Sequence, residues 1–500
     1  MTTSAIVQPL PQVGEFLRRR HSSFIDGKSI EQHPGEVVEV LNPADGQPLT
    51  EILRANLEQV GQAVESSDRA FRSKVWSGLR PADRERILLR FADVFQAHLE
   101  ELAQLVTLEQ GKSINISRAV EVGASVEFIR YMAGWATKIE GQTLDISIPA
   151  PPGSHYNAYT RREPVGVVVG IVPWNFPLMI ALWKIVPALA AGCTVIIKPA
   201  DETPLSALRL AELAVEAGIP PGVFNVVLGR GSLVGPALVE HPLVSKVSFT
   251  GSTEVGKQIG VSAMHNMTRF SLELGGKNPM LILPDADMEQ VVGGALMAGL
   301  LNAGQVCAAA SRFYVPKNRS DEFAQTLAAA VADLQIGAGM DPAAQINPVV
   351  SQRQQQSVLG HLRRAKEQGA KVLTGGDAPD LPGFYIRPTV LANVEQSMDA
   401  ARQEIFGPVL SVLAYDDLEQ ALAMVNDSVY GLAASVWSND MKAVMGLIPR
   451  IEAGTVWVNT HVPLDPSLPF GGYKQSGIGR DFGRGAVEAF TEIKSVCIAY

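Results

Sequence analysis

The chain has 500 residues, of which 46% are hydrophobic, and it carries a formal net charge of -9. This length exceeds the size at which a single hydrophobic core stops growing, so we expect a globular protein with at least two domains. The acidic balance, with no basic run longer than Arg18-Arg19-Arg20, argues against nucleic acid as a partner.

The sequence also carries no signal for a membrane, a disulfide framework or a metal. No stretch approaches the roughly 18 apolar residues of a membrane span, and the N-terminus does not have the pattern of a signal peptide. The three cysteines, Cys193, Cys307 and Cys497, are scattered, and the eight histidines show no ligand spacing. We therefore expect a cytoplasmic protein that contacts no membrane and holds no metal.

Residues 81–111 predict one long amphipathic helix, with Pro81 in its first turn and Gly111 as its C-terminal cap. Residues 141–160 alternate around a Pro-Pro-Gly turn and predict two extended arms that stand outside the core. The final residues, 491–500, predict an apolar edge strand that needs a cover. We expect the arms and this strand to join subunits of a homo-oligomer, a dimer or a tetramer.

From Val165 onward, apolar strands alternate with helical patterns, with strands at 165–173, 193–199, 222–229 and 244–251. This alternation predicts a parallel, doubly wound sheet that binds ligands beyond the carboxyl ends of its strands. Thr203 and Pro204 are expected to start one helix as N-cap and first-turn residue. A second alternating region at 278–469 predicts another α/β domain packed tightly against the first.

Unusual residues gather at the carboxyl ends of these strands. Lys198 and Asp201 are suited to hydrogen-bond ribose hydroxyls, or they form a solvated pair in a loop. Gly251 and Ser252 open a helix whose N-terminus favours an anion, or they form an ordinary strand–helix turn. Gly231 lies in a GxGxxxG pattern that is either a weak dinucleotide fingerprint or a turn into a helix.

The candidate catalytic residues are Cys307, Glu273 and Asn175. A Cys307 thiolate can attack a carbonyl carbon, and Glu273 can take a proton from the water that releases the acyl group. We expect Cys307 to open a short helix that lowers its pKa, although a cysteine is also a common small core residue. Desolvation in an apolar strand would raise the pKa of Glu273 unless it forms a core salt bridge. Asn175 is either an oxyanion donor or a turn asparagine.

The motifs LELGGK at 272–277 and GQVC at 304–307 resemble the aldehyde dehydrogenase superfamily, and the resemblance runs from about Asp26 to the C-terminus. It implies an α/β fold with two doubly wound domains and a small β arm for oligomerisation. The Rossmann-like NAD-binding domain would comprise residues 1–145 and 165–272, the catalytic domain 273–483, and the arm 146–164 and 484–500. Cys307 would be the nucleophile and Glu273 the general base.

The resemblance also implies the cofactor and the residues that relay protons. NAD would contact Ile171, Pro173, Trp174, Lys198, Asp201, Gly231, Phe249, Gly251, Ser252, Glu404 and Phe406. Asp201 is one methylene shorter than the usual glutamate of the family, which leaves the preference for NAD over NADP open. Lys184 and Asp481 would relay protons from the base, and Asp481 again replaces a glutamate.

The implied reaction oxidises an aldehyde to a carboxylic acid through a Cys307 thioester that Glu273-activated water hydrolyses, while Asn175 and a backbone N–H hold the oxyanion. By resemblance the substrate tunnel would be lined by Phe176, Ile180, Trp183, Leu301, Val306, Leu464 and Phe470. This apolar lining without an arginine predicts an arylalkyl aldehyde.

Stretches such as GIVPWNFPLMI at 170–180 are similar to those of bacterial phenylacetaldehyde dehydrogenases. Within the same superfamily, a broad aliphatic or betaine-type aldehyde dehydrogenase remains the alternative. From other classes, a cofactor-free cysteine hydrolase would need a base paired with Cys307, and a non-catalytic structural protein would need no active site at all.

Overall fold

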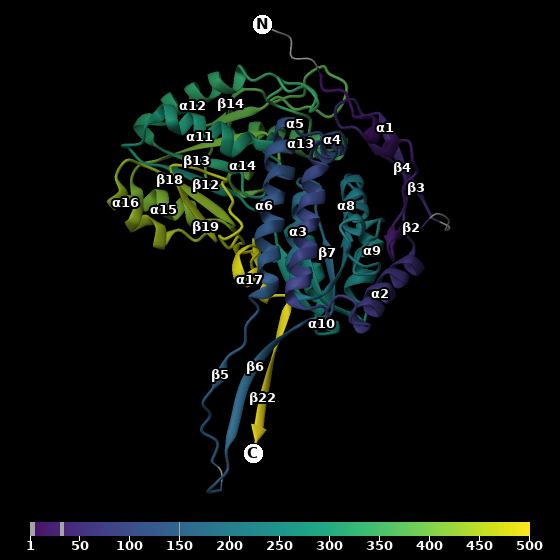
Figure 1. The fold of residues 1–500 in the computed structure, drawn as a ribbon. Coiled ribbons are helices and arrows are strands. Elements are labelled where there is room, and N and C mark those ends of the chain that lie inside the picture. The colour runs from purple at the N-terminus through teal and green to yellow at the C-terminus, as the bar shows by residue number, and fades with distance from the viewer. Residues whose placement is uncertain (1–5, 31–34, 150) are drawn as a thin grey trace.

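A computed structural model of the protein describes residues 6–30, 35–149 and 151–500. It contains an eight-stranded sheet of order β2-β1-β9-β8-β7-β10-β11-β21 and a seven-stranded sheet of order β14-β15-β16-β13-β12-β18-β19. Figure 1 shows each sheet within its own body of helices, and a long arm that projects away from both. The predicted fold class, two α/β domains with an additional β arm, is confirmed.

The first body is built mainly from the N-terminal half of the chain. Its sheet consists of β1 (Phe24–Ile25), β2 (Lys28–Ser29), β7 (Val167–Ile171), β8 (Thr194–Lys198), β9 (Phe224–Val226), β10 (Val244–Thr250), β11 (Arg269–Glu273) and β21 (Gly477–Ile478). A separate hairpin is formed by β3 (Val37–Leu41) and β4 (Pro48–Leu53). Its helices are α1 (Pro11–Leu17), α2 (Leu57–Arg72), α3 (Pro81–Ala97), α4 (Leu99–Gln110), α5 (Ile114–Ile116), η1 (Ser117–Gly123), α6 (Ala124–Ala133), η2 (Gly134–Thr137), α7 (Pro177–Ala191), α8 (Leu205–Glu216), α9 (Gly231–Val239), α10 (Thr253–His265) and α17 (Gly483–Glu488).

The second body follows in the chain. Its sheet consists of β12 (Asn278–Ile282), β13 (Ala310–Pro316), β14 (Lys371–Thr374), β15 (Thr389–Ala392), β16 (Val409–Tyr415), β18 (Ala433–Trp437) and β19 (Thr455–Val458). A small pair is formed by β17 (Tyr430–Gly431) and β20 (Tyr473–Lys474). Its helices are α11 (Met288–Leu300), η3 (Leu301–Gly304), α12 (Lys317–Ala332), α13 (Gln352–Glu367), α14 (Asp399–Arg402), α15 (Leu418–Asn426), α16 (Met441–Leu447) and η4 (Ile448–Arg450).

The register of the first sheet places its chemically unusual residues along one edge. Strands β8, β7, β10 and β11 are parallel neighbours, with Ile171 paired to Lys198, Phe249 paired to Ile171, and Thr250 paired to Glu273. These pairs lie at the carboxyl ends of the strands, where doubly wound sheets bind ligands. The edge strand β21 comes from the segment that we assigned to the catalytic domain, so the chain returns to the first sheet after completing the second.

Two local predictions are wrong at the level of single turns. Residues 81–111 form two helices, α3 and α4, because His98 leaves helical geometry (φ -100, ψ 16) and its Nδ1 lies 2.6 Å from the Glu101 carboxylate. Pro81 does open α3, and Gly111 caps α4 in the left-handed conformation. Thr203 does not cap α8, whose first two amides, at 205 and 206, instead donate to the buried carboxylate of Glu109.

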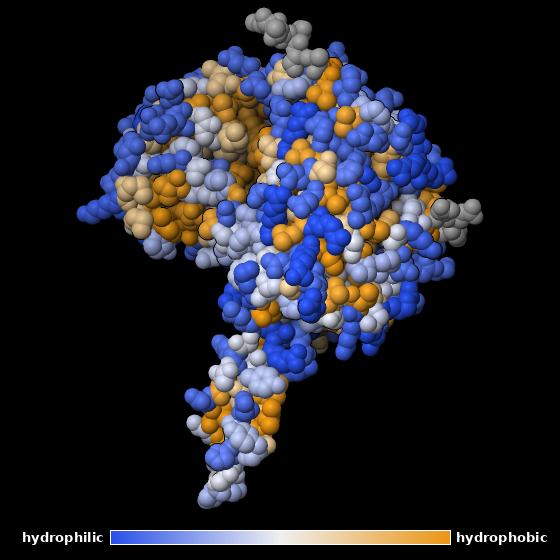
Figure 2. Space-filling model, viewed as in Figure 1, coloured by the Kyte–Doolittle hydropathy of each residue, from blue (hydrophilic) through white to orange (hydrophobic). Residues whose placement is uncertain are grey.

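The arm is a three-stranded antiparallel sheet of β5 (Thr143–Leu144), β6 (Tyr156–Pro164) and β22 (Thr491–Ala499), in the order β22-β6-β5. The register runs from Thr491 opposite Pro164 to Ala499 opposite Tyr156. Figure 2 shows apolar side chains gathered on this arm. The predicted terminal strand is therefore confirmed, whereas its role between subunits stays a prediction. No helix in the described ranges is long and apolar enough to cross a membrane.

Candidate active site

A cavity of about 260 Å³ lies at the carboxyl edge of the first sheet and is completed by residues of the second body. It is lined by Pro173, Trp174, Asn175, Thr250, Gly251, Ser252, Leu274, Gly275, Cys307, Gln354, Glu404 and Phe406. The structure thus brings the candidate nucleophile and oxyanion donor together with much of the predicted cofactor set. Thr250, Leu274, Gly275 and Gln354 were missed. Thr250 and Leu274 adjoin predicted residues and Gly275 lies in the LELGGK motif, whereas Gln354 had no motif to mark it.

Cys307 lies in a turn that leads into β13, and this turn is held from both sides. Asn278 Nδ2 donates to the carbonyl oxygens of Cys307 (2.7 Å) and Ala309 (2.9 Å). A Cβ on Gly276 would lie 2.6 Å from the Cys307 carbonyl oxygen, so only glycine permits this approach. The expected short helix at Cys307 is absent from this described segment. Accordingly the thiol pKa is raised to about 12, by burial first and by Glu404 and Glu273 next, rather than lowered.

Asn175 lies in the loop between β7 and α7 with its side-chain amide directed toward the Cys307 turn. Its Nδ2 donates to the carbonyl oxygen of Gln305 (3.1 Å), two residues before the thiol. The backbone carbonyl of Asn175 accepts from Lys112 Nζ (2.6 Å) and from Asn302 Nδ2 (3.0 Å). An amide nitrogen has two hydrogens, so the second one remains for an oxygen at the cavity.

Glu273 ends β11 as a buried carboxylate, and neither of its oxygens has a hydrogen-bond partner among the described residues. A Cβ on Gly471 would lie 2.5 Å from Glu273 Oε1. Burial raises the Glu273 pKa well above its usual value, Asp481 raises it further, and Lys184 lowers it. A core salt bridge of Glu273, the alternative left open by the sequence, is not formed within the described part of the chain.

Lys184 and Asp481 also meet, with Lys184 Nζ 2.5 Å from Asp481 Oδ2 in a pair that is almost fully buried. The two residues come from α7 and from the segment after β21. The resemblance implied a role for each residue but not their ion pair, and the structure places the pair within electrostatic range of Glu273. Their proton-relay role stays a prediction.

The cavity contains groups that could bind the phosphates and a ribose of a dinucleotide. Ser252 caps α10, its Oγ accepting from the Val255 amide (3.4 Å), and Gly251 precedes it, so the helix N-terminus faces an anion site. Glu404 Oε1 accepts from the Gly276 amide (3.0 Å), and burial raises the Glu404 pKa to about 7. Its other oxygen, Oε2, has room beside Gly275, where a Cβ would lie only 2.2 Å away.

Aromatic rings border the same region. The rings of Trp174 and Phe406 meet edge to face, with centroids 5.2 Å apart. Pro173, the remaining predicted residue at this strand end, lines the cavity beside Trp174.

The remaining predicted cofactor residues share this edge of the sheet but do not line the cavity. Ile171 ends β7 opposite Phe249, the penultimate residue of β10, and Gly231 opens α9. Lys198 Nζ donates to the Pro199 carbonyl (2.7 Å). Asp201 Oδ2 accepts from Arg54 Nη2 (2.6 Å), while its Oδ1 is buried and has no partner among the residues that the structure describes. Arg54 carried no sequence signal, because it precedes Asp201 by 147 residues.

The predicted substrate residues fall into two groups. Phe176, Ile180, Trp183, Val306 and Phe470 belong to one hydrophobic core, against which Leu301 and Cys307 also pack. Leu464 is 37% exposed and lies outside this cluster. Phe482 was missed; its ring centroid lies 4.7 Å from that of Trp183 and 6.2 Å from that of Phe470. The cluster against which Cys307 packs is therefore apolar and contains several aromatic rings, although none of the predicted substrate residues lines the cavity.

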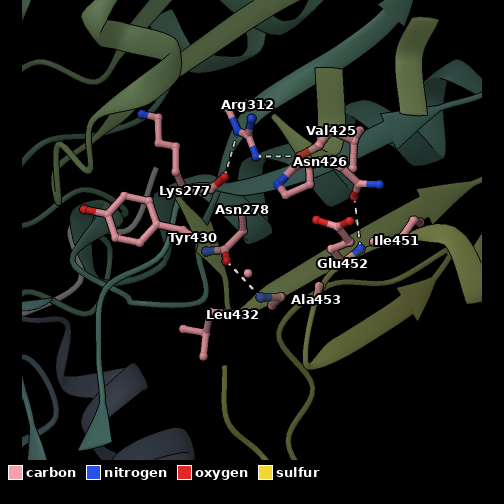
Figure 3. A pocket seen from close by; sticks show the side chains of 13 residues that line it. Lys277, Asn278, Arg312, Val425, Asn426, Tyr430, Leu432, Ile451, Glu452 and Ala453 are labelled. Atoms are coloured by element: carbon pink, nitrogen blue, oxygen red, sulfur yellow. Dashed lines mark hydrogen bonds between the residues drawn. The ribbon is translucent and has the colours of Figure 1, made fainter. Parts of the chain in front are cut away.

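A second, smaller cavity of about 10 Å³ lies behind the 272–277 motif (Figure 3). Arg312 Nε donates to the Lys277 carbonyl (2.7 Å), and Asn278 Oδ1 accepts from the Ala433 amide (3.0 Å). Lys277 Nζ is buried with no hydrogen-bond partner in the described ranges, and burial lowers its pKa to about 7. The cavity holds about one water and supports the motif from behind.

One histidine reaches the Cys307 turn, but it cannot act as the base of a hydrolase. His461 Nε2 lies 2.8 Å from the Ala308 carbonyl oxygen and Nδ1 lies 2.8 Å from Ser435 Oγ. Burial lowers its pKa to about 4, so the ring is neutral, with Nε2–H donating to the carbonyl and Nδ1 accepting from the hydroxyl. Both ring nitrogens are engaged away from the thiol, which argues against the cofactor-free cysteine hydrolase.

Comparison with known proteins agrees with this site. The sequence matches the aldehyde dehydrogenase family over residues 30–496. Phenylacetaldehyde dehydrogenase of Pseudomonas fluorescens is 48% identical over 98% of both chains, and betaine aldehyde dehydrogenase of Cereibacter sphaeroides is 39% identical over 95% of this chain and 97% of its own. The NAD+ complex of an aldehyde dehydrogenase from Bacillus cereus superposes with a TM-score of 0.96, at 41% identity and 99% coverage of each chain. The chain belongs to the aldehyde dehydrogenase family.

Proposed function

We propose that the protein oxidises an arylalkyl aldehyde of the phenylacetaldehyde type to its carboxylic acid with NAD+. The observation that carries this proposal is that the Cys307 thiol and the Asn175 amide line one cavity, with the unpaired buried carboxylate of Glu273 close enough to act electrostatically on the thiol. Cys307 also packs against an apolar cluster that contains Trp183 and Phe470. The balanced reaction consumes aldehyde, NAD+ and water and yields carboxylate, NADH and two protons.

The first covalent step joins Cys307 Sγ to the aldehyde carbon. Because burial holds the thiol pKa near 12, the thiol must lose its proton as the bond forms. Glu273 lies close enough for its charge to act on this thiol, and it is free to accept the proton. The free hydrogen of Asn175 Nδ2 and the Cys307 backbone N–H stabilise the negative charge on the former carbonyl oxygen.

The residues of the cavity, with others along the same edge of the first sheet, fit NAD+, which when bound supplies the acceptor for the aldehyde hydrogen as hydride. Gly251 and Ser252 at the N-terminus of α10 would hold a phosphate. Glu404 would accept from the ribose next to the nicotinamide, and Lys198 with Asp201 would bind the adenosine ribose. Ile171, Pro173, Trp174, Gly231, Phe249 and Phe406 would complete this site.

After oxidation the acyl group is held as a Cys307 thioester. Glu273 then takes a proton from water, whose oxygen attacks the thioester carbon, and the thiolate leaves. A raised pKa suits this task, because a stronger base abstracts the water proton more readily. The Lys184–Asp481 pair tunes Glu273 and would carry its proton away.

The substrate proposal is tested by comparing kcat/KM for phenylacetaldehyde, hexanal and betaine aldehyde, following NADH. Stacking and burial against Trp183, Phe470 and Phe482 should favour the phenyl ring over the alkyl chain. Phenylacetaldehyde is expected to have the highest kcat/KM. A preference for betaine aldehyde would assign these aromatic rings to a cationic substrate instead, and a preference for hexanal would indicate a broad aliphatic enzyme.

A further inference from the structure

A buried ion pair that no part of the mechanism uses contacts the loop between β7 and α7, which carries Asn175. Lys112 follows the cap of α4, and Glu121 lies in the π-helix η1. Lys112 Nζ contacts Glu121 Oε2, and both side chains are 0% exposed. Burying two charges costs free energy that well-packed apolar side chains would not cost. The pair therefore calls for an explanation other than packing.

The ammonium group of Lys112 contacts Asn175, the proposed oxyanion donor, and the neighbouring Phe176. Its Nζ donates to the Asn175 carbonyl oxygen (2.6 Å) and lies 3.7 Å from the centroid of the Phe176 ring. An ammonium has three hydrogens, so it can serve the Glu121 carboxylate, this carbonyl and the ring face together. One cation thus holds the backbone of Asn175 and the ring of its neighbour.

Glu121 holds the other end of the same turn. Its Oε1 accepts from the amides of Leu178 (2.9 Å) and Met179 (3.4 Å), in the first turn of α7. The N-cap residue, Phe176, provides no side-chain cap, so the carboxylate satisfies amides that would otherwise lack a partner and complements the helix dipole. The extra residue per turn of a π-helix accompanies this placement of Glu121, as π-helical turns often do at functional sites.

We propose that Lys112 and Glu121 are positioning residues that clamp the 175–179 turn and so aim the Asn175 side-chain amide at the oxyanion. The clamp acts at the backbone of Asn175, while the Gln305 carbonyl fixes one hydrogen of the side chain. With the backbone of Asn175 and one hydrogen of its side-chain amide both held, the second amide hydrogen can point in only one direction, which we assign to the oxyanion. This inference rests on the proposed function for its catalytic consequence, but not for the clamp itself.

The test variant is Lys112→Met, which keeps the apolar stem and removes the charge. The rate of aldehyde oxidation, kcat, is expected to fall about 10- to 100-fold, a large part of what the loss of an oxyanion donor costs. The KM for NAD+ and the rate of Cys307 alkylation by iodoacetamide are expected to stay within about twofold, because alkylation forms no oxyanion. Amide hydrogen exchange in residues 174–179 should become faster.

A double-mutant cycle separates positioning from general destabilisation. If Lys112 acts through Asn175, then Lys112→Met should reduce kcat little further in an Asn175→Ala background. Equal fold-losses in both backgrounds would overturn the proposal. The matched control is Arg118→Met in the same π-helix, whose ion pair with Glu100 (2.7 Å) does not touch the 175–179 turn. This control should keep the kcat and the exchange rates of the wild type.

Two further outcomes are decisive. If Lys112→Met does not fold, the double variant Lys112→Met/Glu121→Gln is used in every assay instead, because it leaves no unpaired buried charge. A wild-type kcat in any folded variant that lacks Lys112 overturns the proposal. If the wild type oxidises no aldehyde, the proposed function fails, and hydrogen exchange alone decides the clamp. Unchanged exchange in residues 174–179 then overturns the clamp, and faster exchange supports it.

Discussion

Lys184 Nζ lies 2.5 Å from Asp481 Oδ2, in a buried pair whose members are 297 residues apart in the chain. The two charges act with opposite sign on Glu273, since Asp481 raises its pKa and Lys184 lowers it. The pair therefore acts on the protonation of Glu273 without hydrogen bonding to it, and substitution of each member is expected to shift the pH profile in a different direction.

Lys184→Met should move the pH profile of thioester hydrolysis to higher pH. Without the lysine, the Asp481 charge raises the Glu273 pKa further, and a smaller fraction of Glu273 is ionised at neutral pH. Single-turnover hydrolysis measured across pH checks this. A shift to lower pH would show that Lys184 does not act on Glu273 electrostatically.

Asp481→Asn should move the same limb of the profile to lower pH. The remaining ammonium of Lys184 then stabilises the Glu273 carboxylate without opposition, so its pKa falls. The same single-turnover measurement applies. The matched control is Asp465→Asn, which changes an exposed carboxylate that accepts a hydrogen bond from the Ser467 amide. An unchanged profile in Asp481→Asn would exclude the pair as the tuning element.

Glu273→Gln should suppress both the oxidation step and the hydrolysis step. The amide cannot take a proton from the thiol or from water, so we expect turnover to fall about 10²- to 10⁴-fold. Rapid mixing with aldehyde should give no burst of NADH. A full burst, with an acyl group on Cys307 by mass spectrometry, would restrict Glu273 to the hydrolysis step.

Cys307→Ala should lose aldehyde oxidation by at least about 10³-fold, because among the described residues Cys307 supplies the only thiol that lines the cavity. The matched control is Cys497→Ala, which removes the exposed thiol of β22 and should leave turnover unchanged. The variant should still bind NAD+ in calorimetry. Residual turnover close to that of the wild type would refute the assignment of the nucleophile.

Asp201→Ala should raise the NADP+ to NAD+ ratio of kcat/KM about tenfold, or roughly 1.4 kcal/mol. The substitution removes a carboxylate that would repel a 2′-phosphate and frees the Arg54 guanidinium, now held 2.6 Å from Asp201, to attract it. Glu202→Ala is the control, because Glu202 pairs with Arg353 and not with Arg54. An unchanged ratio would place the cofactor's 2′ position elsewhere.

Ile493→Asp in the arm should convert an oligomer to a monomer of 53.5 kDa, as measured by light scattering. Ile493 is 59% exposed on β22, and a charge there would oppose burial against another subunit. Lys494→Gln, next along the strand, is the control and should keep the wild-type mass. A monomeric wild type would refute the oligomer.

Much of the fold could be predicted from the local pattern of apolar and polar residues, whereas less of the candidate site could be. Apolar strands alternating with helices correctly predicted the parallel sheet and the edge at which Lys198 and Thr250 end their strands. The long helix at 81–111 was wrong because the His98–Glu101 contact breaks a periodicity that continues across it. The raised pKa of Cys307 could not be foreseen either, since the helix expected there is a buried turn.

Residue type and order along the chain were enough to identify a thiol, a carboxylate and an amide in glycine-rich backbone, and an alternating α/β chain to carry them. The environment of those groups required the packed molecule. Lys112 reaches the Asn175 carbonyl across 63 residues, Arg54 reaches Asp201 across 147, and Lys184 reaches Asp481 across 297. Desolvation and charge pairing depend on which segments pack together in space. A pattern of neighbouring residues in the sequence does not show which distant segments those are.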